Sequence, residues 1–301
     1  MGNEPGFLAV VDYSLIAITI FIIIIVLFAS KKEVKRNYRR FFLPIGDPDR
    51  AVFVPHRCTK CSVKTIMEEG SVDYSIIIPL FKYNENSINR IVDVYEYFSS
   101  RLSSNSSETF EIIIVSNAAN PLMSRIITFA RKKNNIVLFC LNSDIGFGFY
   151  CVSGVINCNG KSIFVFDING RAEISDFELF IEKQASLVLG LYRFRVDNPS
   201  NLHLFISFLT ELLLSLVGVD ALVSQRSHTL LLRREAARIL IQELDSISSS
   251  YENELIVLSG IHNIDIDCIE HTCASRKDSM KIQSMLVDIG RFISTILHYL
   301  F

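Results

Sequence analysis

The sequence of 301 residues contains no tryptophan and no large excess of charge of either sign. Lysine and arginine together number 30 and aspartate and glutamate 32, which leaves a net charge of −2. A nucleic-acid-binding domain usually carries a surplus of basic residues, so this composition argues against a nucleic-acid partner. The absence of tryptophan excludes no class of protein.

A regular cysteine framework is also missing. The seven cysteines are odd in number and irregularly spaced, and four of them lie in or near apolar runs. This pattern indicates a reducing compartment rather than a disulfide-bonded fold. Cys58 and Cys61 form one Cys-x-x-Cys pair, but a structural zinc site needs four ligands and no second pair exists. A plain loop is the simpler interpretation of this pair, and a metal site is the alternative.

One long apolar run lies near the N-terminus, from Leu8 to Ala29, with Asp12 as its one charged residue. At about 1.5 Å per residue a helix of this length crosses a hydrocarbon core of roughly 30 Å. A cleaved signal peptide would have a basic start and a shorter apolar core, whereas this segment begins with Glu4. We therefore expect residues 1–30 to form a single-pass transmembrane anchor. A buried helix of a soluble domain is the alternative.

The segment after this run is basic, with the sequence KKEVKRNYRR at residues 31–40. Basic flanks stay on the cytosolic side of a membrane, so the body of the protein is expected to face the cytosol. Residues 31–72 contain three prolines among mixed polar residues and are predicted to be a juxtamembrane linker with little regular structure. Residues 73–301 are then the main domain.

Short apolar runs alternate with helix-like spacing through the first half of this domain. Strands are expected at 74–80, 110–116, 135–141 and 162–167, and helices at 86–102 and 124–133 with a short one before the fourth strand. Strands that alternate with helices predict an α/β fold whose sheet is mostly parallel and is flanked by helices. The chain after residue 180 is interpreted as more helical. Its apolar segments 201–219 and 279–301 could lie along a membrane surface or pack in a core.

Ligands of such sheets bind beyond the carboxyl ends of the strands. Polar or glycine-containing corners follow all four predicted strands, and we expect them to converge on one crevice. They are Tyr83-Asn84-Glu85, Ser116-Asn117, the loop with Gly146 and Gly148, and Asp167-Ile168-Asn169-Gly170. The last corner is open to two interpretations, a metal-binding turn or only an Asx turn that closes a strand.

Several segments, taken in order, resemble a known family. Pro79 ends a strand shortly before Tyr83-Asn84-Glu85, Gly154 and Gly160 precede the Asp167 corner, and Asp176 and Glu178 follow it. Further on stand LLLRREAARIL at 230–240, YENELI at 251–256 and a strand-and-loop segment, IDIDCIEHTCASRKDS. In this order and spacing the chain from residue 74 onward resembles the family 2 glycosyltransferases of the GT-A fold, and among them the dolichyl-phosphate β-glucosyltransferases.

The resemblance implies a specific reaction. It is the transfer of glucose from UDP-glucose to dolichyl phosphate, giving dolichyl β-D-glucosyl phosphate for protein N-glycosylation at the endoplasmic reticulum membrane. It also implies Mg²⁺ or Mn²⁺ held by Asp167 and Asn169, with Asp167 as the catalytic residue. The nucleotide-sugar site implied by the resemblance comprises Pro79, Tyr83, Asn84, Glu85, Asn117, Gly146, Gly148 and Gly170.

The chain departs from the family's pattern at four places. The family's second strand ends in Val-Asp-Asp-Gly-Ser, but here it ends in Val115-Ser116-Asn117-Ala118-Ala119 without a carboxylate. The glycine loop has Ile145, Phe147 and Val152 where basic side chains are expected, and Asn169 replaces a second metal carboxylate. The family's Asp-x-Gln-x-Gly-Phe-Lys segment has become SQRSHTLL at 224–231.

The chemistry of such a transfer makes modest demands on side chains. A divalent ion neutralises the diphosphate leaving group, and Mg²⁺ is often held by one or two carboxylates together with phosphate oxygens. Because the acceptor is already a phosphate anion, positioning and charge stabilisation can supply much of the rate. Candidates to bind the acceptor phosphate are Arg193, Arg226, Arg276 and Lys277, while His228 and His271 are assigned no role. Two alternatives remain: a non-catalytic, membrane-anchored binding protein of the same fold, and a transferase for another nucleotide sugar such as GDP-mannose.

Overall fold

The computed structural model describes residues 52–54, 59–60, 65–105, 108–141, 146–170, 172–194, 225–244 and 251–273. The predicted membrane anchor, Cys58, Cys61 and the apolar segments 201–219 and 279–301 lie outside these residues. Within the described ranges, none of the helices combines the length and the apolar character that crossing a bilayer requires.

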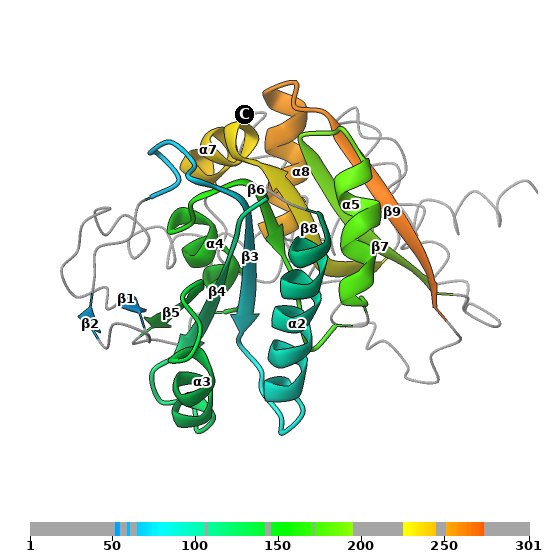
Figure 1. Ribbon diagram of the computed structural model, residues 1–301. Helices are drawn as coiled ribbons and strands as arrows, with labels where there is room; N and C mark the ends of the chain where they lie inside the picture. Colours follow the sequence, from blue (N-terminus) through cyan, green and yellow to red (C-terminus); the bar gives the residue numbers. More distant parts are fainter. Residues whose placement is uncertain are drawn as a thin grey trace, which may run out of the picture.

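One nine-stranded sheet forms the centre of the molecule, in the order β2-β1-β5-β4-β3-β6-β8-β7-β9 (Figure 1). Its strands are β1 (Val52–Val54), β2 (Thr59–Lys60), β3 (Val72–Leu80), β4 (Phe110–Asn117), β5 (Ile136–Leu141), β6 (Gly160–Val165), β7 (Leu187–Phe194), β8 (Gln225–Arg233) and β9 (Ile266–Cys273). The helical elements are α2 (Ser87–Asn105), α3 (Met123–Ala130), α4 (Phe147–Ile156), η1 (Ile174–Asp176), α5 (Phe177–Glu182), α7 (Arg234–Glu243) and α8 (Tyr251–Ile261).

The sheet is mixed, which corrects the prediction of a mostly parallel one. The neighbours β5, β4, β3 and β6 are parallel to one another as predicted, and β7 is parallel to β9. However, β8 runs antiparallel to both of its neighbours, and β1 runs antiparallel to β5 and β2. The chain after residue 180 thus supplies three strands of the sheet, β7, β8 and β9, where mainly helices were expected.

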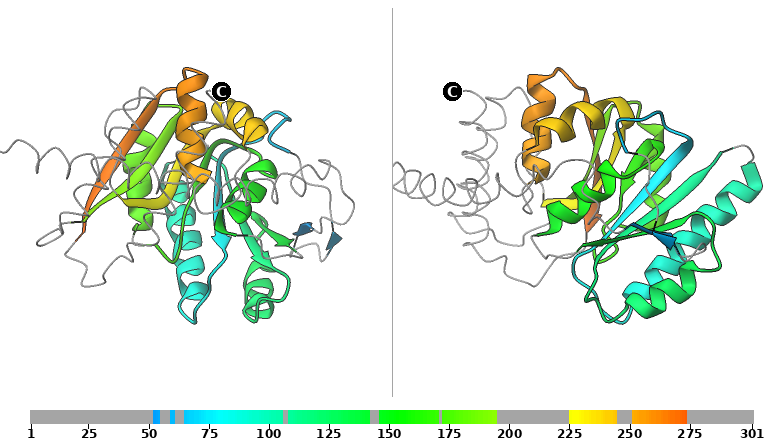
Figure 2. Two further views of the ribbon diagram at one scale, coloured as in Figure 1. Left: turned by 180° about the vertical axis from the view of Figure 1, so that it is seen from behind. Right: turned by 90° about the vertical axis from the view of Figure 1, so that its left-hand side faces the viewer.

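Helices cover both faces of the sheet (Figures 1 and 2). Helices α2, α3 and α5 pack on one face, and α4, α7 and α8 pack on the opposite one. Successive side chains of a strand point to opposite faces, so Ile76 and Ile78 join the first layer while Ile77 joins the second. Because both faces are covered, β3 is apolar at consecutive positions rather than alternating.

Part of the predicted linker belongs to this body. Strands β1 and β2 come from within residues 31–72 and extend the sheet beyond β5. Ile66 is fully buried in the core beneath α4 and α7. The apolar side chain of Ile66 and the strand pairing explain why the described part of this stretch belongs to the folded body.

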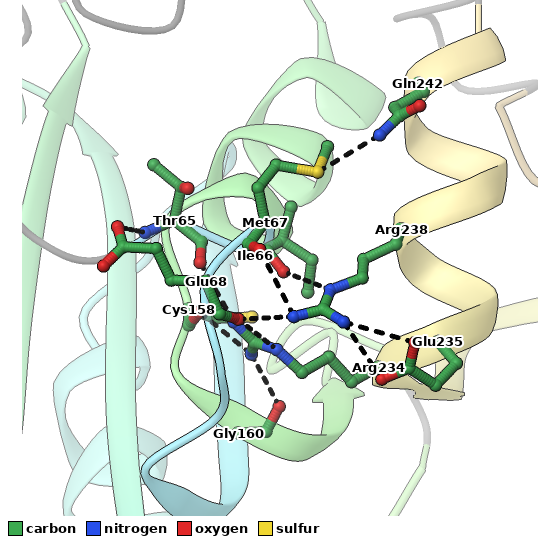
Figure 3. A network of polar contacts seen from close by, with 10 residues as sticks. All are labelled: Thr65, Ile66, Met67, Glu68, Cys158, Gly160, Arg234, Glu235, Arg238 and Gln242. Carbon is green, nitrogen blue, oxygen red and sulfur yellow. Dashed lines mark hydrogen bonds and ion pairs between the residues drawn. The ribbon is translucent and has the colours of Figure 1, made fainter.

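Two arginines of α7 hold the residues that precede β3 (Figure 3). Arg234 is buried and donates hydrogen bonds to the backbone carbonyls of Thr65, Glu68, Cys158 and Gly160, at 2.5–3.3 Å. Arg238 donates to the carbonyls of residues 66–68 at 2.6–3.3 Å. We call these contacts the arginine clamp. The clamp supplies side-chain donors to backbone oxygens of residues 65–68 and of Cys158 and Gly160.

Gly154 shows why α4 can lie so close to β3 and β4. A Cβ at this position would clash with Cγ2 of Ile77 and would lie 3.1 Å from Cγ2 of Val115. A glycine is therefore needed for α4 to pack directly on the two central strands.

Candidate functional site

One residue, Phe166, separates the end of strand β6 from the corner at Asp167. Phe166 still donates to the Ile77 carbonyl at 2.9 Å, after which the chain turns. The amide of Asn169 donates to Asp167 Oδ1 at 2.9 Å, and the amide of Gly170 donates to the Asp167 carbonyl at 2.9 Å. The corner is thus an Asx turn, one of the two interpretations that the sequence left open. The turn bond engages Oδ1 of the Asp167 carboxylate. The turn is therefore compatible with a ligand bound to the same carboxylate.

Asp167 is half-buried, and burial raises the pKa of its carboxyl. The backbone bond from Asn169 and the charge of His228 lower that pKa, and the charge of Glu252 raises it. A carboxylate in this position is stabilised by a cation, because desolvation penalises its unpaired charge.

The ends of β3 and β6 are tied together, as predicted for the two corners. The amide nitrogen Nδ2 of the exposed Asn169 donates to the Lys82 carbonyl at 2.6 Å. Ser87, the first residue of α2, accepts a bond from the Asn84 amide at 2.9 Å, and its Oγ lies 3.5 Å from Asn169 Oδ1. The loop with Tyr83, Asn84 and Glu85 therefore borders the Asp167 corner. All three of these loop residues are exposed, whereas Pro79 is buried within β3.

Arg90 of α2 fixes the far side of the same corner. Its guanidinium donates to the carbonyls of Gly170 and Ala172, each at 3.1 Å. Gly170 thus has a described role in the turn, through its own amide and carbonyl.

The end of β4 is occupied by local bonds. Asn117 Oδ1 accepts from the Ala119 amide at 2.8 Å. The buried Ser116 Oγ accepts from Asn120 Nδ2 at 2.8 Å. These bonds form a self-contained turn at the position where the resemblance implies two carboxylates.

The glycine loop leads into α4 through Gly146, whose φ of 150° strongly favours glycine. Gly148 is buried in the first turn of the helix. Phe147 lies between them, and its ring centroid is 5.0 Å from that of His228 and 6.4 Å from those of Phe81 and Tyr251. An aromatic cluster thus stands where the resemblance implies basic side chains.

His228 is a residue of this region to which the sequence analysis assigned no role. It lies in β8 with a φ of 54°, a left-handed conformation that is rare for residues other than glycine. Its Nδ1 is 3.0 Å from Oε1 of Glu252, a side chain only 3% exposed in the first turn of α8.

The four acceptor-phosphate candidates are described only in part. The backbone of Arg193 pairs with Thr272 in β9, and that of Arg226 pairs with Leu191 in β7. Arg276 and Lys277 lie outside the described residues. The role predicted for these four residues stays a prediction.

The donor set at the corner fits a metal ion that is shared with a ligand. Among the described residues no group of three His, Cys, Asp or Glu side chains could enclose an ion. One half-buried carboxylate beside an amide oxygen suits Mg²⁺ or Mn²⁺ that takes its remaining ligands from phosphate and water. Asp167 and Asn169 are the residues that would hold it.

The fold and this corner together describe an α/β protein with a polar site at the carboxyl ends of its central strands. The chain is similar to two proteins of Trichomonas vaginalis that are named as dolichyl-phosphate beta-glucosyltransferases. It is 24% identical to ALG5C over 270 residues, which are 84% of this chain and 80% of that protein. It is 25% identical to ALG5A over 156 residues, which are 50% of this chain and about half (48%) of that protein. These relatives confirm the resemblance to family 2 glycosyltransferases and support a glycosyltransferase.

Two solved structures that the chain matches have TM-scores below 0.5. Glucosyl-3-phosphoglycerate synthase from Mycobacterium tuberculosis, in complex with Mn²⁺, UDP and phosphoglyceric acid, has a TM-score of 0.48 at 13% identity. That similarity covers 76% of this chain and 78% of the synthase. S. aureus TarS 1-349 has a TM-score of 0.41 at 15% identity. That match covers 66% of this chain and 58% of the TarS chain. No protein-family model matches the chain.

Proposed function

We propose that the protein transfers glucose from UDP-glucose to dolichyl phosphate and forms dolichyl β-D-glucosyl phosphate. The observation that carries this proposal is the similarity over 84% of the chain to a protein named for that activity, together with the half-buried Asp167 at the carboxyl end of β6. The similarity supports a glycosyltransferase, and the donor and the acceptor are the proposed part.

The contacts at the corner support a role in positioning a nucleotide sugar. A divalent ion held by Asp167 and Asn169 would neutralise the diphosphate leaving group. The bond from Asn169 to Lys82 fixes the corner against the loop with Tyr83 and Asn84, and Arg90 fixes it against α2. The acceptor phosphate is itself the nucleophile, so no enzymatic base is required. The chain's own residues need to bind and orient the nucleotide sugar and the acceptor and to exclude water.

The direct test is transfer of labelled glucose from UDP-glucose to dolichyl phosphate by membranes that contain the full chain. The Asp167→Ala variant is expected to lose at least about 100-fold of the activity, because it loses the ligand of the charge-stabilising ion. Asp93→Ala is the matched control, since Asp93 is an exposed carboxylate on α2. Full activity of a folded Asp167→Ala protein would refute the assignment of this corner.

A second candidate is a non-catalytic binding protein of the same fold. Two observations favour it: Ser116 and Asn117 are engaged in a local turn, and Phe147 stands in the glycine loop. Thermal-shift measurements with Mn²⁺ and a panel of nucleotide sugars separate the candidates. Stabilisation by UDP-glucose supports the first proposal. Stabilisation by GDP-mannose instead supports a transferase with another donor. If no nucleotide sugar stabilises the protein, the non-catalytic binding protein is supported.

We also propose that residues 1–30 anchor the protein in the endoplasmic reticulum membrane with the main domain in the cytosol. The basic run at 31–40 and the composition of the apolar segment support this topology. Asn105-Ser106-Ser107 is a glycosylation sequon that would remain unmodified on the cytosolic side. A glycosidase-sensitive gel shift that disappears in Asn105→Gln would reverse the proposed orientation.

A further inference from the structure

Arg90 joins the Asp167 corner to the first turns of α2 by two hydrogen bonds. We propose that Arg90 is the positioning residue of this corner and holds the turn in the geometry that binds a divalent ion. The inference rests on the proposed function, because it assumes that Asp167 and Asn169 hold such an ion. In this role Arg90 acts through the backbone of the turn and does not contact the ion.

The guanidinium of Arg90 reaches two carbonyls at the end of the corner. Its Nη1 donates to the Gly170 carbonyl and its Nη2 to the Ala172 carbonyl, each at 3.1 Å. The two carbonyls flank residue 171, which lies outside the described residues. A guanidinium is planar and holds its donors in a fixed fork, so two bonds from one side chain define how both peptide groups lie relative to each other. The exit of the turn is therefore held from α2.

The bonds within the corner orient its beginning. The amides of Asn169 and Gly170 both donate to Asp167 at 2.9 Å, and these two bonds define the Asx turn. The Asn169 side chain donates to the Lys82 carbonyl at 2.6 Å. These contacts orient residues 167–170, whereas the contact of the Ala172 carbonyl comes from Arg90. An ion shared by Asp167 and Asn169 needs both oxygens in place at once, and groups that orient the ligands commonly set the affinity of a metal site.

Helix α2 gives Arg90 a fixed base. The Arg90 amide donates to the Asn86 carbonyl at 3.1 Å, at the start of the helix. Ile88 and Ile91 on either side of it are buried in the apolar layer between α2 and the sheet. Ala172 is buried in the same layer. The guanidinium and one of its acceptors thus belong to segments that pack together, so the packing of this layer sets the position of the fork.

The variant that tests this proposal is Arg90→Lys. Lysine keeps the positive charge but offers one ammonium group in place of the planar fork. The two acceptors are neutral carbonyls, so Arg90→Lys changes the geometry of the contact and leaves the charge in place. Arg90→Gln is less suitable, because a positive charge near a divalent ion opposes its binding and its removal would partly offset the lost geometry.

Arg233 provides a matched control. Its guanidinium also donates two bonds, to Ser162 Oγ at 2.7 Å and to the Lys183 carbonyl at 3.0 Å, and it is half-buried like that of Arg90. Ser162 lies near the start of β6 and precedes Asp167 by about 16 Å of extended chain. Arg233→Lys therefore breaks a fork of the same kind at the opposite end of the strand.

The measurement is isothermal titration calorimetry of the full chain in detergent with Mn²⁺, without and with UDP. Arg90→Lys is expected to bind Mn²⁺ about tenfold more weakly than the wild type in both titrations, because contacts that orient metal ligands typically contribute this much. Arg233→Lys is expected to match the wild type in Mn²⁺ affinity. Asp167→Ala is expected to lose the binding, since it lacks the carboxylate ligand.

Hydrogen exchange in the presence of a chelator gives a second readout that does not depend on the ion. The Gly170 amide, which donates to the Asp167 carbonyl, is expected to exchange faster in Arg90→Lys than in the wild type. In Arg233→Lys its rate is expected to stay unchanged. A general loss of stability would accelerate this exchange in both variants, so the comparison isolates a local effect at the corner.

The outcomes separate this inference from the proposed function. Mn²⁺ binding that Asp167→Ala abolishes but Arg90→Lys leaves unchanged overturns the role of Arg90 and keeps the corner as a metal site. Equal losses of Mn²⁺ affinity in Arg90→Lys and Arg233→Lys indicate a general effect on the fold and also overturn the inference. Mn²⁺ binding that survives Asp167→Ala refutes the metal site of the proposed function and, with it, the role of Arg90. Both are likewise overturned if the wild type binds no Mn²⁺ in either titration.

Discussion

At the scale of single residues, Asp167 combines two opposing requirements. The proposed chemistry needs its carboxylate charged, whereas burial raises its pKa and so favours the neutral form. Residues with this property often reduce the stability of a fold while serving its function.

The Asp167→Asn variant makes this opposition measurable. Asparagine keeps an oxygen that can accept the turn bond from Asn169 and removes a half-buried charge. We expect the free energy of unfolding without metal to rise by about 1 kcal/mol while glucose transfer is lost. Urea unfolding in a chelator provides the measurement. A less stable Asp167→Asn protein would show that the charge supports the fold rather than opposing it.

Predictability from the sequence differs between residues of the site. The polar corner at Asp167 and its proximity to Asn84 followed from two local patterns, the end of an apolar run and a turn sequence. The contact of His228 with Glu252 did not, because 24 residues separate the two and the pairing depends on how β8 meets α8. The self-contained turn of Asn117 also depends on backbone geometry that composition does not show.

At the scale of elements, the helices and strands of the first half were predicted closely. Helix α2 covers 87–105 where 86–102 was expected, since Ile88, Ile91 and Phe98 repeat at helical spacing and are buried. Strand β8 was missed. Its residues are polar at the start and apolar at the end, because only its second half pairs with β6 in the centre of the sheet.

The arginine clamp joins α7 to the residues before β3, and its two arginines differ in exposure. Arg234→Lys is expected to lower the free energy of unfolding by about 3 kcal/mol, because lysine cannot serve four buried carbonyls at once. Arg238→Lys is the matched control with an expected loss of about 1 kcal/mol, since several of its bonds are exposed. Chemical denaturation of both variants tests this difference. Equal losses would mean that burial does not set the strength of the clamp.

Arg101 joins α2 to the start of α5 through Glu178. Burial alone would raise the pKa of Glu178, but hydrogen bonds from Arg101 and Tyr97 outweigh it and lower the pKa below the ordinary 4.5. The unfolded chain therefore binds more protons than the folded one around this pH, so the contact stabilises the fold above pH 4.5 and is lost as the pH falls further.

The Glu178→Gln variant tests this pH dependence. Wild type is expected to be more stable than Glu178→Gln at pH 7, and the difference should shrink as the pH falls below 4.5. Urea unfolding between pH 7 and 3.5 measures it. A difference that stays constant over this range would exclude the ion pair as its source.

At the scale of the whole molecule, the sheet is shared by two helical layers. Neighbouring residues of β3 enter opposite layers, so one layer cannot lose its packing without exposing strands that the other needs. The sequence predicted the α/β class and the parallel centre. It could not predict that the rest of the sheet contains antiparallel pairs, because the position of β8 between β6 and β7 is set by long-range pairing.

The two layers are expected to unfold in one cooperative transition. Because the chain has no tryptophan, a single introduced tryptophan reports on one layer alone. Tyr95→Trp on α2 and Phe149→Trp on α4 replace half-buried aromatic residues on opposite faces. In each variant the urea midpoint from fluorescence should equal that from circular dichroism. Separate midpoints would show that the layers unfold independently.

The arginine clamp has a consequence for how this protein can change over generations. Arg234 binds backbone oxygens, and every residue type supplies the same backbone oxygen. The side chains of Thr65 and Glu68 are therefore free to drift without weakening its bonds, while Arg234 itself is not. Among diverging descendants, the arginine should outlast the residues that it holds.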